Sequence, residues 1–298
     1  MADGLASAGA SLDGPRTGRG LLLFGLVGVL LILVGFFFGL PALIVLGVLV
    51  LTPVMILLGE RDPRIAYGLA GFGVILLAFG SYWGLARAPN EVYMGDVQRI
   101  MYVHVPTAWN AMIPLTFAFV CALFFLFGND WKWDNRLEAA MEVGVMLSVL
   151  LCMQGSIWAK PTWGVWWDWD PRLTTTAVLV FAFGAIIALR AFVDDPVKRA
   201  VWSAVAAIVA FVDVPIVYFS VRWWNSLHQV QSTPETVSKG FLLPLRTNAF
   251  GIWFLTCGLT GLRSHLAALR LQSELAPPLP EGPKTSVVVA AALAGGAR

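Results

Sequence analysis

The feature that most constrains the fold is a series of long apolar runs, each about as long as a membrane is thick. Two of them, LLLFGLVGVLLILVGFFFGL (21–40) and PALIVLGVLVLTPVMILLG (41–59), follow one another directly. A helix needs about 20 apolar residues to cross a bilayer. In lipid, a single run can satisfy its own backbone groups only as a helix. The sequence therefore predicts an all-α polytopic membrane protein.

Six further runs extend the series, and we expect them to form a six-helix core bundle within 65–272. They cover residues 65–86, 107–128, 138–159, 172–192, 199–220 and 247–269. The two earlier runs predict an additional N-terminal transmembrane hairpin at 21–60, with a tight turn at Gly39 and Pro41, which gives about eight spans in all. One long kinked segment in place of the hairpin is the alternative.

The composition excludes several classes of function. With 58% hydrophobic residues, 13% charged residues and a formal charge of +2, the chain has neither a basic patch for nucleic acid nor a glycine-rich loop for nucleotide phosphates. Cys121, Cys152 and Cys257 lie in apolar runs without CxxC spacing. We therefore interpret the cysteines as packing residues rather than disulfides or metal ligands.

Counting the spans places three segments on one side of the membrane. Two spans separate the segment around His104 from the tryptophan-rich stretch 163–170, and two more separate that stretch from His228. The loops on the opposite side carry more Lys and Arg, so the positive-inside rule puts the three segments outside. In a bacterium they would face the periplasm from the inner membrane. We expect residues 1–20 to be disordered, and the Pro-rich tail 273–298 to be disordered in the cytoplasm.

Tryptophans and acids are concentrated in WGVWWDWDPRLTTT (163–176), most of which belongs to an expected external loop at 160–172. The residues concerned are Trp163, Trp166, Trp167, Asp168, Trp169 and Asp170. Two interpretations are open: an aromatic belt at the membrane surface, or a platform for a flat ligand. Asp170 and Pro171 are typical of a helix start, which would fix the rings against a helix end. The dense spacing with two acids favours the platform.

Two histidines accompany tryptophan on the same side, His104 in YVHVPTAW and His228 in WWNSLHQ. Each lies just outside a predicted span, and either one alone is typical of an interfacial histidine. Together, beside flat rings, two neutral imidazoles are suited to be axial ligands of a haem iron. Cations near the haem propionates could come from Lys160, Arg172, Arg99 and Arg222.

Several other ionisable residues receive structural interpretations. Asp213 lies near the middle of a span, where Pro215 frees a backbone carbonyl, so we expect a protonated Asp213 that is hydrogen-bonded at a kink. We interpret Glu138 and Glu142 as a solvated or partner-facing edge. His265 would lie in the last turn of the final helix, where it meets the helix dipole.

Four motifs together resemble a known family. WGVWWDWDPRLT (163–174) is similar to the tryptophan-rich WWD motif of haem-handling proteins. With HVPTAW (104–109), KPTWG (160–164) and WWNSLHQ (223–229), it resembles cytochrome c maturation protein C, also called haem exporter protein C. The resemblance covers residues 65–272. The hairpin before Ile65 and the Pro-rich tail are not part of the family's six-helix pattern.

The resemblance implies a ligand, a set of site residues and partners. His104 and His228 would be the axial ligands of haem b, carried as cargo at the periplasmic face of the inner membrane. The other haem-binding residues carried over by motif are Trp163, Trp166, Trp167, Asp168, Trp169, Asp170 and Arg172. The protein would be a carrier rather than an enzyme, and would deliver haem to the periplasmic chaperone cytochrome c maturation protein E. Its other implied partners are an ABC-type complex of an ATPase, a second membrane subunit and a small single-span subunit, together with membrane lipid.

A permease-like subunit is the alternative. Asp213 and Gln154 would then line a path for another small molecule through the helix bundle, and the tryptophans would form only a belt. Haem handling predicts that substitutions at the outer loops are the damaging ones, whereas a permease predicts that Asp213→Asn is. A purely structural assembly subunit would bind no chromophore.

Overall fold

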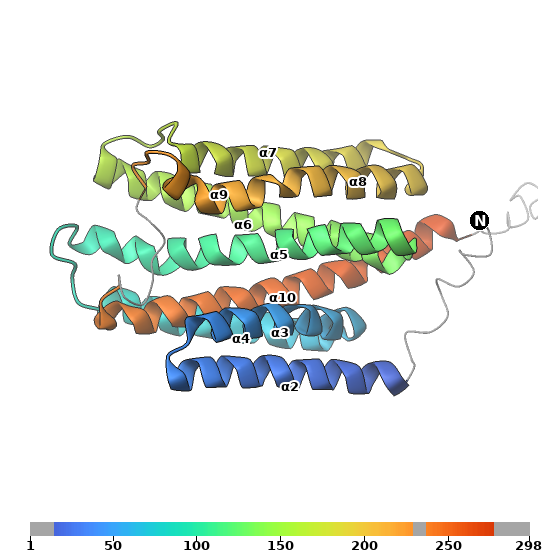
Figure 1. Ribbon diagram of the computed structural model, residues 1–298, viewed down its shortest axis with the longest axis horizontal. Coiled ribbons are helices and arrows are strands. Elements are labelled where there is room, and N and C mark those ends of the chain that lie inside the picture. Colours follow the sequence, from blue (N-terminus) through green and yellow to red (C-terminus); the bar gives the residue numbers. More distant parts are fainter. Residues whose placement is uncertain (1–14, 229–236, 277–298) are drawn as a thin grey trace, which may run out of the picture.

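The structure is a computed structural model that describes residues 15–228 and 237–276, in which long helices run along one axis (Figure 1). The helices are α2 Pro15–Phe38, α3 Pro41–Arg61, α4 Pro63–Ala86, η2 Asp96–Ile100, α5 Met101–Gly128, α6 Trp131–Trp163, α7 Pro171–Phe192, α8 Pro196–Phe211, α9 Asp213–Trp223 and α10 Lys239–Leu275. The described part of the chain contains no β-strand beyond one isolated bridge, between Glu91 and Gly95. The predicted all-α fold is confirmed.

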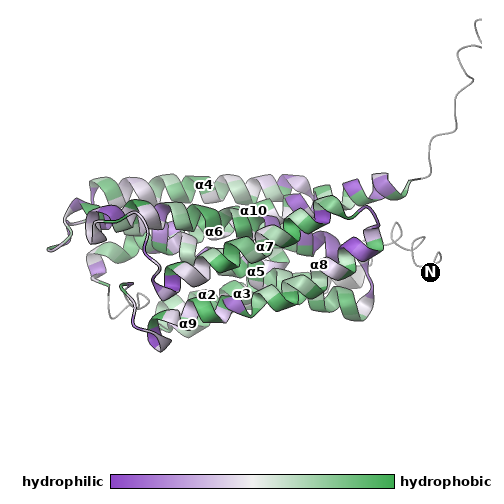
Figure 2. Ribbon diagram, turned by 90° about the horizontal axis from the view of Figure 1, so that it is seen from above, coloured by the Kyte–Doolittle hydropathy of each residue, from purple (hydrophilic) through white to green (hydrophobic). Residues whose placement is uncertain are grey.

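Seven segments of the described chain are long and apolar enough to cross a membrane, with α8 and α9 together forming one of them. Hydrophilic residues gather at the two ends of the bundle (Figure 2). The remaining predicted run, 247–269, lies in α10, whose buried polar residues include Asn248, Thr256, Thr260 and Ser264. Because α10 packs against α3, α4, α5 and α6, these side chains face other helices rather than lipid. The chain is therefore a multi-pass membrane protein.

The helices begin where the sequence supplies caps. Asp62, Asp170 and Asp195 each accept a hydrogen bond from a backbone N–H of the following helix, and each is followed by proline at the first helical position. Gly39 has a φ of +67°, which glycine adopts without strain, and it forms the expected turn between α2 and α3. The N-terminal hairpin is thus present as predicted.

The ends of the chain are more helical than expected. Residues 15–20 belong to α2 and residues 273–275 to α10, although both stretches are predicted to be disordered. Residues 1–14 and 277–298, which make up most of the two predicted disordered ends, lie outside the described residues.

The hairpin is joined to the bundle through α3. Ile56 is buried in the main hydrophobic core, and the indole N–H of Trp253 donates to the hydroxyl of Thr52 at 2.8 Å. Glu60 accepts two hydrogen bonds from the guanidinium of Arg136. Helix α2 packs mainly on α3. One helix of the hairpin is therefore part of the core, and the other covers it.

Helix α5 begins six residues earlier than the predicted span, at Met101 rather than at residue 107. Pro106 lies within this extra length; it lacks an N–H and cannot bond to the carbonyl of Tyr102. In the structure the side-chain amide of Asn248 donates to that carbonyl at 2.6 Å. A side chain 146 residues away thus satisfies the freed group, and the helix continues through the proline.

The span predicted at 199–220 is broken into α8 and α9 at Val212. Pro215 explains the break, because its ring clashes with the carbonyl four residues earlier, that of Phe211, where α8 ends. The expected kink is therefore present. We also expected the carboxyl group of Asp213 to be hydrogen-bonded. This prediction is wrong for Oδ2, which is buried and has no hydrogen-bond partner in the described part of the chain.

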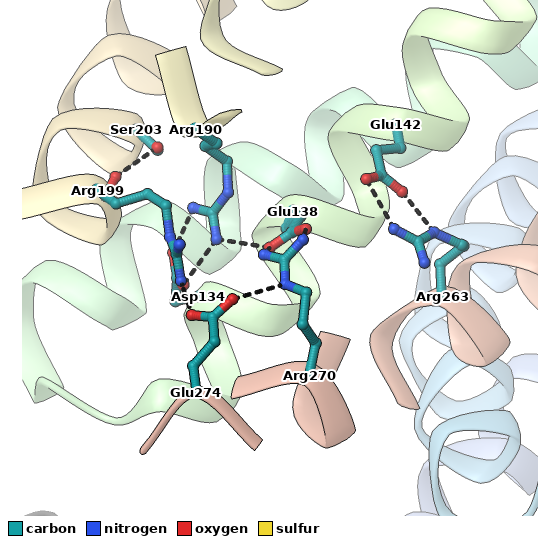
Figure 3. A network of polar contacts seen from close by, with 9 residues as sticks. All are labelled: Asp134, Glu138, Glu142, Arg190, Arg199, Ser203, Arg263, Arg270 and Glu274. Carbon is teal, nitrogen blue, oxygen red and sulfur yellow. Dashed lines mark hydrogen bonds and ion pairs between the residues drawn. The ribbon is translucent and has the colours of Figure 1, made fainter. Parts of the chain in front are cut away.

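The end of the bundle opposite the tryptophan-rich stretch contains a network of buried ion pairs (Figure 3). Arg190 of α7 donates to both oxygens of Asp134 and to Glu138, and Arg270 of α10 also donates to Glu138. Arg190, Asp134 and Glu138 are all less than 10% exposed. The interpretation of Glu138 as a solvated or partner-facing edge was therefore wrong, because its partners come from helices far along the chain.

Of two further residues at this end, Glu142 keeps part of its expected solvent exposure, whereas His265 differs from expectation. Glu142 pairs with Arg263, and the pair is partly exposed. His265 lies ten residues before the end of α10 at Leu275, so it is not in the last turn of that helix. Its Nδ1 lies 3.0 Å from the carbonyl oxygen of Glu60. His265 thus links α10 to the end of α3 instead of meeting a helix dipole.

Substitution of Gly73 by alanine is expected to destabilise the bundle. A Cβ at Gly73 would lie 2.6 Å from the carbonyl oxygen of Gly251, because α4 and α10 approach closely there. Overpacking of this kind costs about 1–3 kcal/mol, which thermal unfolding in detergent would detect. Gly68→Ala on the same helix is the control, since its Cβ would meet nothing within 4 Å. Equal midpoints for the two variants would contradict the prediction.

Candidate functional site

A cavity of about 780 Å³ opens among the helices near the end of the bundle that carries the tryptophan-rich stretch. Its wall is formed by residues from α2, α3, α5, α6, α7, α9 and α10 and from the loops that follow α6 and α9. Most of the lining is apolar and aromatic, with a few histidines and arginines. Size and lining are those of a site for a small organic ligand.

Two imidazoles face this cavity from different elements. The ring of His104, on the first turn of α5, lies 6.4 Å from the ring of His228 between centroids, and the two planes are tilted by 30°. The segments around His104 and His228 are far apart in the sequence but were predicted to meet. The short distance between the two rings confirms that prediction. His104 lies inside helix α5 and is only 7% exposed, which corrects its expected position just outside a span.

The surroundings of His104 hold it in place. Trp158 of α6 meets its ring edge-on, with centroids 5.3 Å apart. A Cβ at Gly155 would lie 3.3 Å from Cε1 of His104, so a glycine at this point of α6 leaves room for the imidazole. Nδ1 of His104 is buried and has no hydrogen-bond partner in the described residues. A buried, unsatisfied nitrogen beside a cavity is typical of a group that serves a ligand.

The tryptophan-rich stretch divides into two pairs. Helix α6 extends to Trp163 and ends at Gly164, which has a φ of +81°, so the loop is shorter than the expected 160–172. Trp163 and Trp167 line the cavity, and Trp163 meets the ring of His228 edge-on at 6.4 Å. Trp166 and Trp169 are 59% and 76% exposed and do not line it. The structure therefore brings only two of the four tryptophans of the predicted platform to the histidines.

Asp170 fixes the segment that carries His228. Its carboxylate caps α7 through the backbone N–H of Arg172 and also accepts from the hydroxyl of Ser226 and the backbone N–H of Leu227. Burial raises the pKa of this carboxyl, but these hydrogen bonds and nearby His228 outweigh it and hold the pKa below its usual 3.8. Asp168 is exposed and belongs, with Asp170, to a separate pocket of about 270 Å³.

The four candidate cations differ in position. Arg172 and Arg222 line the cavity, and Nη1 of Arg172 lies 3.4 Å from Nδ1 of His228. Arg99 instead donates to the backbone carbonyl of Gly84 and to Asp96. Lys160 donates to the carbonyl of Gly164. Arg99 and Lys160 therefore have structural partners and are not part of the cavity wall.

Sequence reasoning missed three residues of the site. Trp158 and Gly155 lie in an apolar span, where nothing in the pattern separates them from ordinary packing residues. Arg246 lines the cavity from α10. Its position directly before the predicted span 247–269 is also typical of a snorkelling cation, so its sequence position carried no distinct signal. The cavity as a whole can hold a flat apolar molecule with a metal at its centre and acidic groups at its edge.

Comparison with known proteins places this arrangement in a family. The family model described as heme exporter protein C matches residues 60–276. The heme exporter protein C of Bradyrhizobium diazoefficiens is 36% identical over 216 residues, 70% of this chain and 82% of the relative. That of Escherichia coli K12 is 34% identical over 207 residues, 68% of this chain and 84% of the relative. An Arabidopsis thaliana protein named as a putative cytochrome c biosynthesis ccmC-like mitochondrial protein is 31% identical over 67% of this chain and 77% of its own length. The chain belongs to the heme exporter protein C family.

Proposed function

We propose that the protein holds haem b as cargo in the cavity, with His104 and His228 as axial ligands, and passes it to a periplasmic haem chaperone. As a member of its family, this multi-pass membrane protein has a role in haem handling for c-type cytochrome biogenesis. The finer assignments, of the ligands, the orientation and the recipient, are the proposal. The protein acts in it as a carrier and not as an enzyme.

The observation that carries the proposal is the spacing of the two imidazoles. A bond between a metal ion and an imidazole nitrogen is about 2 Å long and the nitrogen lies roughly 1 Å from the ring centroid, so two imidazoles that share one metal have centroids about 6 Å apart. The centroids of His104 and His228 are 6.4 Å apart. A haem iron already has four nitrogen ligands and takes two more, one from each face.

The rest of the lining suits the porphyrin. Trp163 and Trp167 offer flat apolar surfaces in the cavity, and aromatic rings pack well on a planar macrocycle. Arg172 lies beside His228, where its guanidinium can form charge-assisted hydrogen bonds with a propionate. The Arg172 guanidinium also interacts electrostatically with the carboxylate of Asp170. Asp170 thus interacts both with this arginine and with the segment that carries His228.

We assign the delivery of haem to the surface that would face the periplasm. The exposed rings of Trp166 and Trp169, with the exposed Asp168 between them, form an outer edge beside the cavity. A periplasmic chaperone such as cytochrome c maturation protein E would dock on this edge, since exposed aromatic side chains are typical of recognition surfaces. The ATPase, the second membrane subunit and the small single-span subunit of an ABC-type complex complete the proposed assembly in the bacterial inner membrane.

The test is a visible absorption spectrum of the detergent-purified protein before and after addition of ferric haem. The expected result is stoichiometric binding with a low-spin, six-coordinate spectrum. A protein that stays colourless and leaves added haem unchanged would refute the proposal. A high-spin spectrum would retain haem binding but reject the pair of axial histidines.

Asp170 is expected to act as a positioning residue for His228. Asp170→Ser keeps a helix cap for α7 but loses the carboxylate that holds Ser226 and Leu227, so haem dissociation should accelerate about tenfold. The measurement is transfer of haem to an excess of apomyoglobin, followed by absorbance. Folding lowers the pKa of Asp170. The hydrogen bonds from Ser226 and Leu227 to its carboxylate therefore contribute fully above pH 3.8 and are lost as the pH falls through the lowered pKa.

The matched control for Asp170→Ser is Asp195→Ser, which alters the equivalent cap of α8 away from the cavity. Its haem dissociation should equal that of the wild type. Equal haem dissociation rates for the wild type and the two variants would show that the hydrogen bonds to the Asp170 carboxylate do not position His228.

A permease-like subunit remains the second candidate because of two buried polar atoms. Oδ2 of Asp213 and Oε1 of Gln154 have no hydrogen-bond partner in the described residues, as expected of groups that line a path for a polar molecule. Neither residue lines the cavity described above. Asp213→Asn separates the two functions. A haem carrier with this substitution should bind haem normally, whereas a permease should no longer move its small molecule through the bundle.

A further inference from the structure

The haem cavity extends beyond the family region of the chain. Part of its wall comes from the N-terminal hairpin, which precedes residue 60, where the match to the family begins. The hairpin residues in the wall are Phe36, Pro41, Ile44, Val45, Val48 and Leu49. This hairpin therefore lies against the proposed ligand rather than on a remote face of the bundle.

The hairpin is held firmly against the bundle at this point. The ring of Phe36 packs on that of Phe250 of α10, with centroids 5.8 Å apart. A Cβ at Gly35 would lie 2.9 Å from the backbone nitrogen of Ile44, so α2 and α3 are in close contact just before their turn. The hydrogen bond between Trp253 and Thr52 fixes α3 further along. The hairpin wall is thus a packed part of the fold.

The hairpin also meets the one cation that α10 contributes to the cavity. The guanidinium carbon of Arg246 lies 5.7 Å from the centroid of the Phe36 ring, within the range of a cation–π contact. Arg246 lines the cavity and is half-buried. Among residues 15–228 and 237–276, Arg246 forms no ion pair with a carboxylate. A guanidinium held at an apolar wall without a counter-ion is suited to bind an acidic group of a ligand.

We propose that Arg246, positioned by Phe36 of the hairpin, binds a carboxylate of the cargo. This inference rests on the proposed function, because haem supplies the flat apolar body and the two carboxylates. Arg172 approaches the cavity from α7 and Arg246 from α10, so the two guanidiniums reach the ligand from different helices. The hairpin thereby positions a carboxylate-binding group of α10 in a cavity whose histidines also lie in the family region.

The test compares Arg246→Gln with the wild type for two probes, ferric haem and ferric haem dimethyl ester, in which both carboxylates are esterified. Loss of one charge-assisted hydrogen bond should weaken haem binding about tenfold and leave binding of the ester unchanged. Arg246→Lys keeps the charge and should recover part of the loss. Arg87→Gln is the matched control, because Arg87 is exposed and does not line the cavity.

The role of the hairpin is tested by Phe36→Leu, which removes the ring but keeps an apolar side chain. It should weaken haem binding several-fold, again without effect on the ester, because the guanidinium loses its aromatic support. The control is Phe37→Leu, since Phe37 is 85% exposed and does not line the cavity. Unfolding midpoints of all variants identify any that are misfolded.

The outcomes separate this inference from the function on which it rests. If the wild type binds haem with a six-coordinate spectrum but Arg246→Gln binds both probes as the wild type does, the carboxylate assignment is wrong and the function stands. Equal weakening for haem and ester would also overturn it, because Arg246 would then act through packing alone. Failure of the wild type to bind either probe would refute the proposed function itself.

Discussion

His104→Ala and His228→Ala are each expected to abolish the six-coordinate haem spectrum. The two rings are spaced for one metal between them, so removal of either imidazole leaves a five-coordinate, high-spin iron or an empty protein. Haem affinity should fall by at least tenfold in each variant, because a metal–ligand bond is lost from an apolar, water-poor cavity. Absorption spectra and haem titrations of the purified variants measure both effects.

The controls for these variants use the other ionisable groups of the bundle. His265→Ala removes a histidine that lies at the opposite end and contacts the carbonyl of Glu60, so its haem spectrum should match the wild type. Asp213→Asn should behave in the same way. Unchanged haem occupancy in both His104→Ala and His228→Ala would exclude them as ligands. Loss of function only in Asp213→Asn would favour the permease.

The two histidine variants should also differ from one another. His104 is buried on a helix between Trp158 and Gly155, so its truncation leaves a cavity shaped for an imidazole. Free imidazole is therefore expected to restore a six-coordinate spectrum in His104→Gly. His228 is held by a loop, whose position depends on Asp170 and Ser226. That loop can rearrange when the side chain is lost, so rescue of His228→Gly should need more imidazole.

The positions and order of the long apolar helices could be predicted because membrane thickness imposes a length on each apolar run. The sidedness of the loops followed from the same count, and it correctly brought His104, Trp163 and His228 together. The helix limits were less accurate. Helix α5 continues through Pro106, where the distant side chain of Asn248 donates to the carbonyl that the proline leaves free.

The parts of the site that could not be predicted depend on which helices become neighbours. Four tryptophans share one motif, but the end of α6 at Gly164 decides that Trp163 and Trp167 face the cavity and that Trp166 and Trp169 do not. Arg246 lines the cavity from α10, where it also lies over the ring of Phe36 in the hairpin. Such contacts are set by packing of the whole bundle, which no local pattern records.

Arg190→Met is expected to destabilise the bundle strongly. Arg190 donates to Asp134 and Glu138, and Glu138 keeps a second partner in Arg270, whereas Asp134 has no other ion-pair partner among the described residues. The substitution therefore leaves a buried carboxylate unpaired, which costs about 3–5 kcal/mol. Denaturant unfolding in mixed micelles would measure the loss.

A second substitution separates the buried charge from the lost packing. Asp134→Leu combined with Arg190→Met removes both charges of the pair, and replacement of a buried pair by apolar side chains is often close to neutral, so the double variant should recover most of the stability. Lys132→Ala is the surface control, since Lys132 lies 3.9 Å from Asp130 and both side chains are at least 36% exposed, and its effect should stay below about 1 kcal/mol. A loss for Arg190→Met no larger than that of Lys132→Ala would show that the network does not hold α6 and α7 together. Because these residues lie at the end of the bundle opposite the cavity, haem binding should persist in Arg190→Met wherever the protein remains folded.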